Sequence, residues 1–229
     1  SYAKQHLPNH EVFDEVRYFV PGKQPCVFEI DGYRLGLVIC EDAWHAASAA
    51  MATHAGAQLL VIPNASPYHL EKHALREDIL RARVIETGLP LIYVNAVGGQ
   101  DELVFDGGSF ALNSRGNLAW RLPQFQEELA IIQFDGDCVT DRISAITSVE
   151  DQVYRALVLG VKDYVGKNGF PGAIIGLSGG VDSALVLAIA VDALGADRVR
   201  AVMMPSRYTA DISWLDAREM ANQLGVQYD

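Results

Sequence analysis

Residues 176–183 bring glycines, hydroxyls and a carboxylate together in one short stretch, Gly-Leu-Ser-Gly-Gly-Val-Asp-Ser. The apolar run 173–177 predicts a buried strand before the loop, and the run 184–194 predicts a helix after it. Glycines let a backbone approach an anion closely, and the N–H groups at the start of a helix form a site for phosphate. The stretch therefore predicts a phosphate-binding loop between a strand and a helix.

This loop lacks the lysine of the common mononucleotide-binding motif, G-x-x-x-x-G-K-[ST]. Its composition favours a nucleotide that is cleaved between its α- and β-phosphates, with pyrophosphate held by backbone N–H groups. Ser178 and Ser183 supply neutral donors, and Asp182 is the candidate Mg²⁺ ligand. The alternative is a glycine-rich turn without a ligand, but we expect each polar position to face the crevice at the end of the strand.

Cys40 is the second group with reactive chemistry, because it follows the apolar run 33–39 and precedes a predicted helix over about 41–54. A thiol at a helix N-terminus is expected to have a lowered pKa, which favours the nucleophilic thiolate. Glu41 and Asp42 follow it and oppose thiolate formation, so we expect a cation nearby in the fold. The residues alone leave open the alternative of a cysteine buried as a small hydrophobic side chain.

The composition is that of an ordinary globular protein, with 229 residues of which 50% are hydrophobic and 21% are charged. A net charge of -11 argues against a nucleic-acid groove, which needs a face rich in Lys and Arg. The sequence contains no apolar run long enough to cross a bilayer and no signal peptide, so we expect no membrane partner. Three cysteines at no metal-like spacing predict no disulfide framework and favour a reducing, cytoplasmic setting.

The elements that must position these groups fall into two series. The first alternates strands and helices and then forms hairpins, which predicts a mixed sheet layered with helices and ending in a strand over 129–134. The second begins with helical spacing over 149–165 and continues as a parallel, doubly wound sheet. The predicted fold class is therefore α/β with two domains, residues 1–140 and 148–229, joined by a linker over 141–147.

Two sets of motifs resemble those of the glutamine-dependent NAD synthetase family. Residues 2–9, 13–15 and 38–42 resemble its glutaminase half, which belongs to the nitrilase group. Residues 176–183 and 204–209 resemble its synthetase half, an ATP pyrophosphatase-type domain. The resemblance runs along essentially the whole chain. It implies a partial nitrilase-like α-β-β-α sandwich followed by the N-terminal part of a Rossmann-like synthetase domain.

The resemblance also implies a reaction. Cysteine-dependent hydrolysis of glutamine supplies ammonia, while ATP, with Mg²⁺, converts deamido-NAD into an acyl-adenylate. Ammonia then gives NAD, with release of AMP and pyrophosphate. The partners implied are these small molecules and further copies of the chain in a homo-oligomer. Two alternatives remain: an amidase fused to a non-catalytic nucleotide-binding domain, and an interaction fragment without catalysis.

The resemblance assigns roles to the residues that match its motifs. Cys40 is the nucleophile that forms a thioester, and Lys4 stabilises the thiolate and the oxyanion. The Glu41 N–H is the second oxyanion donor, and Glu15 orients Lys4. The candidate glutamine-binding residues are His10, Ser66 and Lys72, of which His10 stands where the family more often has Tyr. The candidate ATP-binding residues are Gly176, Leu177, Ser178, Gly179, Gly180, Val181, Asp182 and Ser183, with Asp182 also the metal ligand.

The nitrilase triad also contains a glutamate general base, which the resemblance places upstream of the lysine and before Ser1. Further contacts with ATP, Mg²⁺ and the dinucleotide are expected after Asp229. We therefore expect these 229 residues to be the middle of a longer enzyme, unable to complete either reaction alone.

Overall fold

The computed structural model describes residues 1–10 and 12–229, which divide into two compact units. The first unit comprises residues 1–97 and 105–147, and the second comprises residues 98–104 and 148–229. Residues 98–104, which the sequence-based division assigns to the first domain, therefore group with the second unit. In the described ranges, every helix is too short or too polar to cross a lipid bilayer.

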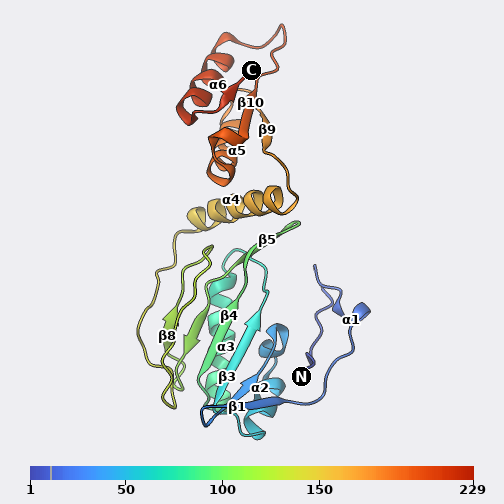
Figure 1. The fold of residues 1–229 in the computed structure, drawn as a ribbon, viewed down its shortest axis with the longest axis vertical. Coiled ribbons are helices and arrows are strands. Elements are labelled where there is room, and N and C mark those ends of the chain that lie inside the picture. Colours follow the sequence, from blue (N-terminus) through green and yellow to red (C-terminus); the bar gives the residue numbers. More distant parts are fainter. Residues whose placement is uncertain (11) are drawn as a thin grey trace. The chain divides into compact units, whose positions relative to one another are not determined.

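The first unit is built on a six-stranded sheet with the order β1-β2-β3-β4-β7-β8 (Figure 1). Its strands are β1 (Cys26–Ile30), β2 (Tyr33–Leu37), β3 (Leu59–Asn64), β4 (Leu91–Asn95), β7 (Phe110–Leu112) and β8 (Leu118–Arg121). β2, β3 and β4 run parallel, whereas β1 pairs antiparallel with β2, and β7 and β8 return antiparallel beyond β4. The sheet is mixed, as predicted.

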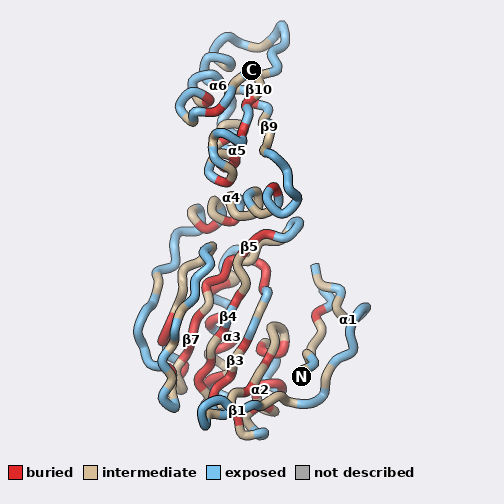
Figure 2. Tube along the Cα trace, in the orientation of Figure 1, coloured by how far each residue is buried: buried red, intermediate tan, exposed pale blue. Residues whose placement is uncertain are grey.

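Helices α2 (Ala46–His54) and α3 (Lys72–Thr87) pack together against this sheet (Figure 1). The core between them and the sheet includes Ala52, Val84 and Ile62, and Figure 2 shows the buried stretches on the central strands. A second cluster, around Trp120, joins the sheet to the segment that follows β8. The short helix α1 (Glu15–Tyr18) buries none of its residues.

Two predicted elements of this unit are wrong. The helix expected over 41–54 is interrupted, because His45 is extended between the 3-10 helix η1 (Cys40–Trp44) and α2. The strand expected over 129–134 does not form, and only an isolated bridge between Phe134 and Cys138 is present there. The apolar alternation of this segment still separates buried from exposed side chains. Residues 130, 132 and 134 pack on the Trp120 cluster, whereas Leu129 is 95% exposed.

The second unit contains a three-stranded parallel sheet with the order β11-β10-β9. Its elements are α4 (Val149–Lys167), β9 (Ala173–Gly176), α5 (Val181–Leu194), η2 (Ala196–Arg198), β10 (Val199–Val202), α6 (Asp211–Leu224) and β11 (Gln227–Tyr228). Ser148 caps α4 by accepting a hydrogen bond from the Asp151 N–H at 3.3 Å. Helices alternate with the parallel strands, as the sequence predicts for a doubly wound sheet.

A hairpin formed by β5 (Val97–Gln100) and β6 (Leu103–Asp106) contributes residues 98–104 to the second unit. The Gly99 N–H donates to Asp163 Oδ2 at 2.7 Å, and Lys167 Nζ donates to the Gly99 carbonyl at 2.5 Å. A Cβ at Gly99 would lie 3.2 Å from the Gly160 Cα on α4. Glycine on both surfaces therefore allows the hairpin to approach the helix closely.

Candidate functional site

Cys40 lies on a sharp turn between the strand-like residues after β2 and the 3-10 helix η1. Its backbone is left-handed, with φ at 46°, whereas Ile39 before it is extended. A non-glycine residue with this conformation is strained, and such residues cluster at active sites. The turn presents the thiol as a nucleophile elbow presents its serine, at the point where a strand gives way to a helix.

Burial and the neighbouring groups shift the pKa of the Cys40 thiol in opposite directions. Burial raises the pKa of the thiol, and the carboxylates of Glu41 and Glu15 raise it further. The Lys4 ammonium and a hydrogen bond from the Glu41 N–H lower it, but burial prevails and the pKa stays above its usual value. The predicted lowering by a helix N-terminus is therefore wrong, because Cys40 begins a 3-10 helix of only 5 residues and the thiol is shielded from water.

Lys4 supplies a cation beside Cys40, and Glu15 holds its ammonium. Lys4 Nζ donates to Glu15 Oε1 at 2.8 Å and to Oε2 at 2.7 Å. The two side chains are only 15% and 24% exposed, so the pair is more strongly fixed than an ordinary surface ion pair. The structure thus brings together the Cys40 thiol, the Lys4 ammonium with its partner Glu15, and the Glu41 N–H.

Ser66 belongs to a buried polar network next to the sheet. Its N–H donates to Asn95 Oδ1 at 2.9 Å, and its hydroxyl accepts from Arg76 Nε at 3.3 Å. Arg76 Nη1 donates to Asp106 at 2.8 and 3.0 Å. Sequence reasoning missed Arg76, which looks like part of the solvated face of a helix, and Asp106 and Asn95, which lie at the ends of strands. A polar residue at an apolar position of α3 is the only signal that could have singled out Arg76.

Tyr93 is another residue that sequence reasoning missed. Its hydroxyl is buried, and the Ser66 side chain lies close enough to lower its pKa by hydrogen bonding. Burial raises the pKa of Tyr93, Arg76 lowers it and Cys40 raises it, which places the hydroxyl in the electrostatic field of both groups. Tyr93 therefore connects the surroundings of Cys40 with the buried network of Ser66 and Arg76.

The other two candidate glutamine-binding residues are Lys72 and His10. Lys72 is the first residue of α3 and is half-buried. His10 is exposed, with its ring edge-on to Phe13 at 6.1 Å between centroids. Within residues 1–10 and 12–229, no hydrogen bond or ion pair joins His10 to Cys40.

The loop 177–180 connects β9 to α5 in the second unit. Gly179 has φ at 82°, and a Cβ there would lie 2.0 Å from the Ser213 carbonyl oxygen, so only glycine fits. The Ser178 N–H donates to Ser183 Oγ at 3.2 Å, and Ser183 Oγ donates to the Gly180 carbonyl at 2.9 Å. The hydroxyls therefore hold the loop in its turned conformation.

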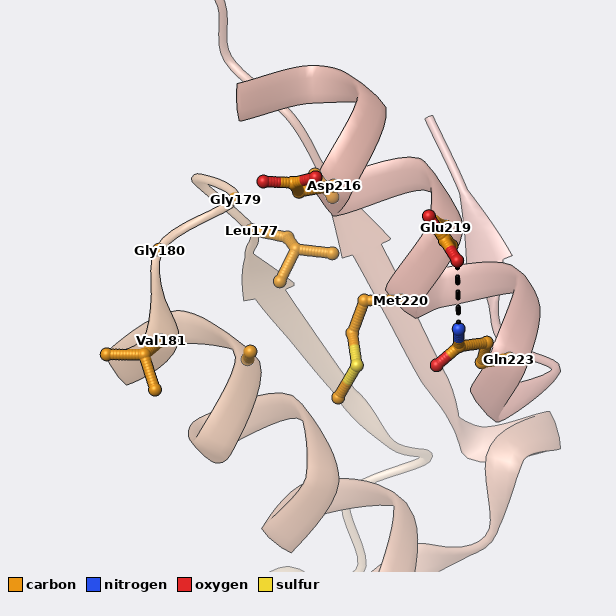
Figure 3. Close-up of a pocket in the computed structure, with 10 residues that line it drawn as sticks. Leu177, Gly179, Gly180, Val181, Asp216, Glu219, Met220 and Gln223 are labelled. Carbon is orange, nitrogen blue, oxygen red and sulfur yellow. Dashed lines mark hydrogen bonds between the residues drawn. The ribbon is translucent and has the colours of Figure 1, made fainter. Parts of the chain in front are cut away.

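A cavity of about 370 Å³ opens between this loop and α6 (Figure 3). Leu177 and Met220 provide apolar side chains that point into it, whereas Val181 points away (Figure 3). On the α6 side the lining is acidic, and Glu219 accepts a hydrogen bond from Gln223 at 3.1 Å. The complete lining is Leu177, Gly179, Gly180, Val181, Ala184, Asp216, Ala217, Glu219, Met220 and Gln223. The α6 residues were missed, because nothing in their helical spacing marks them as facing the loop.

The chemistry of the loop fits a nucleotide and its metal ion. The first N–H groups of α5 have no acceptor within the helix and point toward the loop, where they suit phosphate oxygens. Asp182 is exposed in this first turn. Mg²⁺ in nucleotide sites is bound through one or two carboxylates together with the phosphates, which matches the position of Asp182.

Both parts of the chain match known protein families. Residues 1–142 match the carbon-nitrogen hydrolase family model, and residues 153–229 match the NAD synthase family model. The glutamine-dependent NAD(+) synthetase of Rhodobacter capsulatus is 47% identical over 231 residues, which cover 99% of this chain and 42% of that protein. The enzyme of the same name from Acinetobacter baylyi is 45% identical with the same coverage. The chain therefore spans about 42% of the length of these curated relatives.

Solved structures give the same result. A glutamine-dependent NAD+ synthetase from Acinetobacter baumannii, in complex with adenosine diphosphate, has a TM-score of 0.95 and 44% identity, covering 99% of this chain and 44% of that one. A carbon-nitrogen hydrolase from Helicobacter pylori has a TM-score of 0.51 and 29% identity, covering 56% of this chain and 48% of that one. The predicted fold class and the resemblance are confirmed. Through residues 1–142 the chain belongs to the carbon-nitrogen hydrolase family, and it continues over residues 153–229 into a segment that matches the NAD synthase family.

Proposed function

We propose that this chain is part of a glutamine-dependent NAD synthetase, a ligase in which one unit releases ammonia from glutamine and the other uses it to amidate deamido-NAD. The observation that carries the proposal is the left-handed turn at Cys40, with Lys4 and Glu15 beside it, in one chain with the glycine loop before α5. A reactive thiol and an anion-binding loop are the two devices that this coupled reaction requires.

In the first unit, Cys40 Sγ attacks the side-chain amide carbon of glutamine. The tetrahedral intermediate expels ammonia and leaves a thioester, which water hydrolyses to glutamate and free thiol. The Lys4 ammonium and the Glu41 N–H stabilise the oxyanion, and Glu15 orients Lys4. The candidates for holding the charged groups of glutamine are His10, Ser66 and Lys72.

In the second unit, the nicotinate carboxylate of deamido-NAD attacks the α-phosphorus of ATP, and pyrophosphate leaves. Ammonia then attacks the acyl-adenylate carbonyl, and AMP leaves with formation of NAD. Residues 176–183 hold the phosphates chiefly through the backbone N–H groups at the start of α5, and Asp182 would hold Mg²⁺, which would neutralise charge on the polyphosphate. The proposal includes domains over 1–140 and 148–229 with a 141–147 linker, a cytoplasmic homo-oligomer, and neither nucleic acid nor membrane as partner.

The test compares two nitrogen sources in the full-length protein. Cys40→Ala is expected to abolish NAD formation from glutamine and to retain NAD formation from added ammonium, because only the first unit needs the thiol. Cys26→Ala, at a half-buried position on β1, is the matched control and should retain both activities. Loss of both activities in Cys40→Ala would contradict the division of labour.

A second variant tests the loop. Asp182→Ala should remove NAD formation from either nitrogen source, whereas Asp197→Ala, exposed on η2, should not. Wild-type protein should release pyrophosphate from ATP only when deamido-NAD is present. If glutamine is hydrolysed but no pyrophosphate appears, the protein is an amidase fused to a nucleotide-binding domain without catalysis.

A further inference from the structure

The carboxylate of Asp42 is completely buried, at 0% exposure, and it receives hydrogen bonds from the N-terminal segment. Tyr2 Oη donates to Oδ2 at 2.7 Å. The backbone N–H groups of Gln5 and His6 donate to Oδ1 at 2.9 and 2.6 Å. His6 Nδ1 lies 3.1 Å from the same oxygen. Asp42 therefore binds the main chain of a segment that lies more than thirty residues away in sequence.

Lys4 lies inside the segment that Asp42 holds. The donors to the carboxylate come from Tyr2 on one side of it and from Gln5 and His6 on the other. Asp42 itself is in η1, the 3-10 helix that begins with Cys40. One short element thus carries both the nucleophile and the anchor for the segment that carries the cation.

Besides Asp42, the segment around Lys4 is held by the Lys4–Glu15 ion pair, by stacking of the His6 ring on His45, and by neutral hydrogen bonds. Its large apolar side chains Val16, Tyr18, Phe19 and Val20 are exposed, so burial of apolar surface contributes little to its placement. Ser48 Oγ donates to Gln5 Oε1 at 2.8 Å, and the Gly22 N–H donates to the Lys4 carbonyl at 2.8 Å. A buried carboxylate bonded to backbone N–H groups is a stronger restraint than these neutral contacts, because charge-assisted hydrogen bonds are about twice as strong.

We propose that Asp42 is a positioning residue that holds Lys4 beside Cys40. The charged side chains that shift the pKa of the thiol are Lys4, Glu41 and Glu15, so Asp42 acts on the thiol through Lys4. The inference depends on the proposed function only in that the thiol is taken to react with glutamine. Its physical content is that loss of the Asp42 carboxylate moves the ammonium away and leaves the thiol harder to ionise.

The experiment measures alkylation of Cys40 by iodoacetamide in the full-length protein. The rate is followed from pH 6 to 10 by mass spectrometry of the peptide that carries Cys40, because the other cysteines also react. Asp42→Asn is expected to move the profile to higher pH by about one unit, which lowers the rate near pH 7 about tenfold. Tyr2→Phe removes a single donor and should lower it about threefold. Asp31→Asn, in the exposed β1–β2 turn, is the control and should leave the profile unchanged.

A double substitution separates positioning from a general loss of structure. In the Lys4→Met background the ammonium is already gone, so adding Asp42→Asn should change the alkylation rate less than twofold. A carboxylate that only stabilised the fold would lower the rate by the same factor in both backgrounds. The inference is overturned by equal factors, or by wild-type profiles for both Asp42→Asn and Tyr2→Phe. If Asp42→Asn does not fold, Tyr2→Phe with and without Lys4→Met decides the question.

Alkylation needs no substrate, so this result is independent of the proposed reaction. If wild-type protein hydrolyses no glutamine but the alkylation profiles shift as expected, the proposed function fails and the positioning role stands. If glutamine is hydrolysed and the profiles do not shift, the positioning role fails and the proposed function stands.

Discussion

Nη1 of Arg76 donates to both carboxylate oxygens of Asp106, at 2.8 and 3.0 Å, and the two side chains are each 1% exposed. Nη2 of Arg76 also donates to the Ser66 carbonyl at 2.9 Å, so the pair anchors the loop after β3. Removing one partner leaves a buried charge unpaired. Asp106→Ala should therefore lower the free energy of unfolding by about 3–5 kcal/mol, measured by urea denaturation.

Glu86→Ala is the control for this prediction. Glu86 pairs with Arg83 at 2.9 Å, but its side chain is 45% exposed, and such a pair contributes less than about 1 kcal/mol. Similar losses in the two variants would show that burial does not determine the contribution of the Arg76–Asp106 pair.

Lys4→Met should impair the thiol chemistry in two ways. The loss of an oxyanion-stabilising group is expected to reduce the kcat of glutamine hydrolysis by about 10²-fold or more. The loss of the ammonium also raises the thiol pKa further, so the rise of activity with pH should move to higher pH, since only the thiolate reacts. Steady-state glutaminase kinetics between pH 6 and 10 measure both effects. Lys23→Met, at an exposed position of the same segment, should change neither.

Gly179→Ala should disrupt the loop before α5. The added Cβ would lie 2.0 Å from the Ser213 carbonyl oxygen, at a residue with φ of 82°. Strain and overlap together should cost about 3 kcal/mol. We expect a lower melting temperature and loss of ATP-dependent activity, whereas glutamine hydrolysis persists.

Gly166→Ala serves as the matched control in α4. Nothing lies within 4 Å of a Cβ at this helical position, so the substitution should stabilise the helix by up to about 1 kcal/mol. A fall in melting temperature as large as that of Gly179→Ala would mean that any added methyl group is harmful to this unit.

Glu77 should contribute a stability that disappears in acid. Burial pushes the pKa of Glu77 up, but hydrogen bonds from His73 and Arg121 outweigh it, and the pKa is lowered overall. A lowered folded-state pKa means that the contribution is fully present above the unfolded value, about 4.3, and is lost as pH falls through the folded value. Glu77→Gln should therefore be less stable than wild type at pH 7, and urea denaturation should show this difference shrinking below about pH 4.3. A difference that stays constant down to pH 3 would rule out this linkage.

The groups that could be predicted from sequence were those whose signals are local. Apolar runs located the strands before Cys40 and before the glycine loop, and Gly179 marked a turn that only glycine can form. Asp42 could not be recognised in this way. Beside Glu41 it looks like one more acid on a rim, and its donors, Tyr2 and His6, are 40 and 36 residues away.

Other features depended on tertiary packing that a single sequence does not specify. No proline or glycine near His45 indicates that the helix is interrupted there. The boundary between η1 and α2 is visible only in the structure, where His45 is extended. In residues 129–134 apolar side chains do alternate, and those at 130, 132 and 134 pack on the cluster around Trp120. The backbone of this segment nevertheless pairs with no strand. Asp216 and Glu219 of α6 face the loop only because of how α6 packs in the second unit.

The β5–β6 hairpin has a practical consequence for protein engineering. A gene cut just before Ser148 would encode a C-terminal fragment without residues 98–104, although these residues belong to the same compact unit as α4. Asp163 and Lys167 would lose their backbone partner at Gly99, and the glycine surface at Gly160 would be laid bare. A second unit expressed by itself should therefore carry residues 98–104 fused to residues 148–229. These two segments are separate in the sequence but belong to one compact unit.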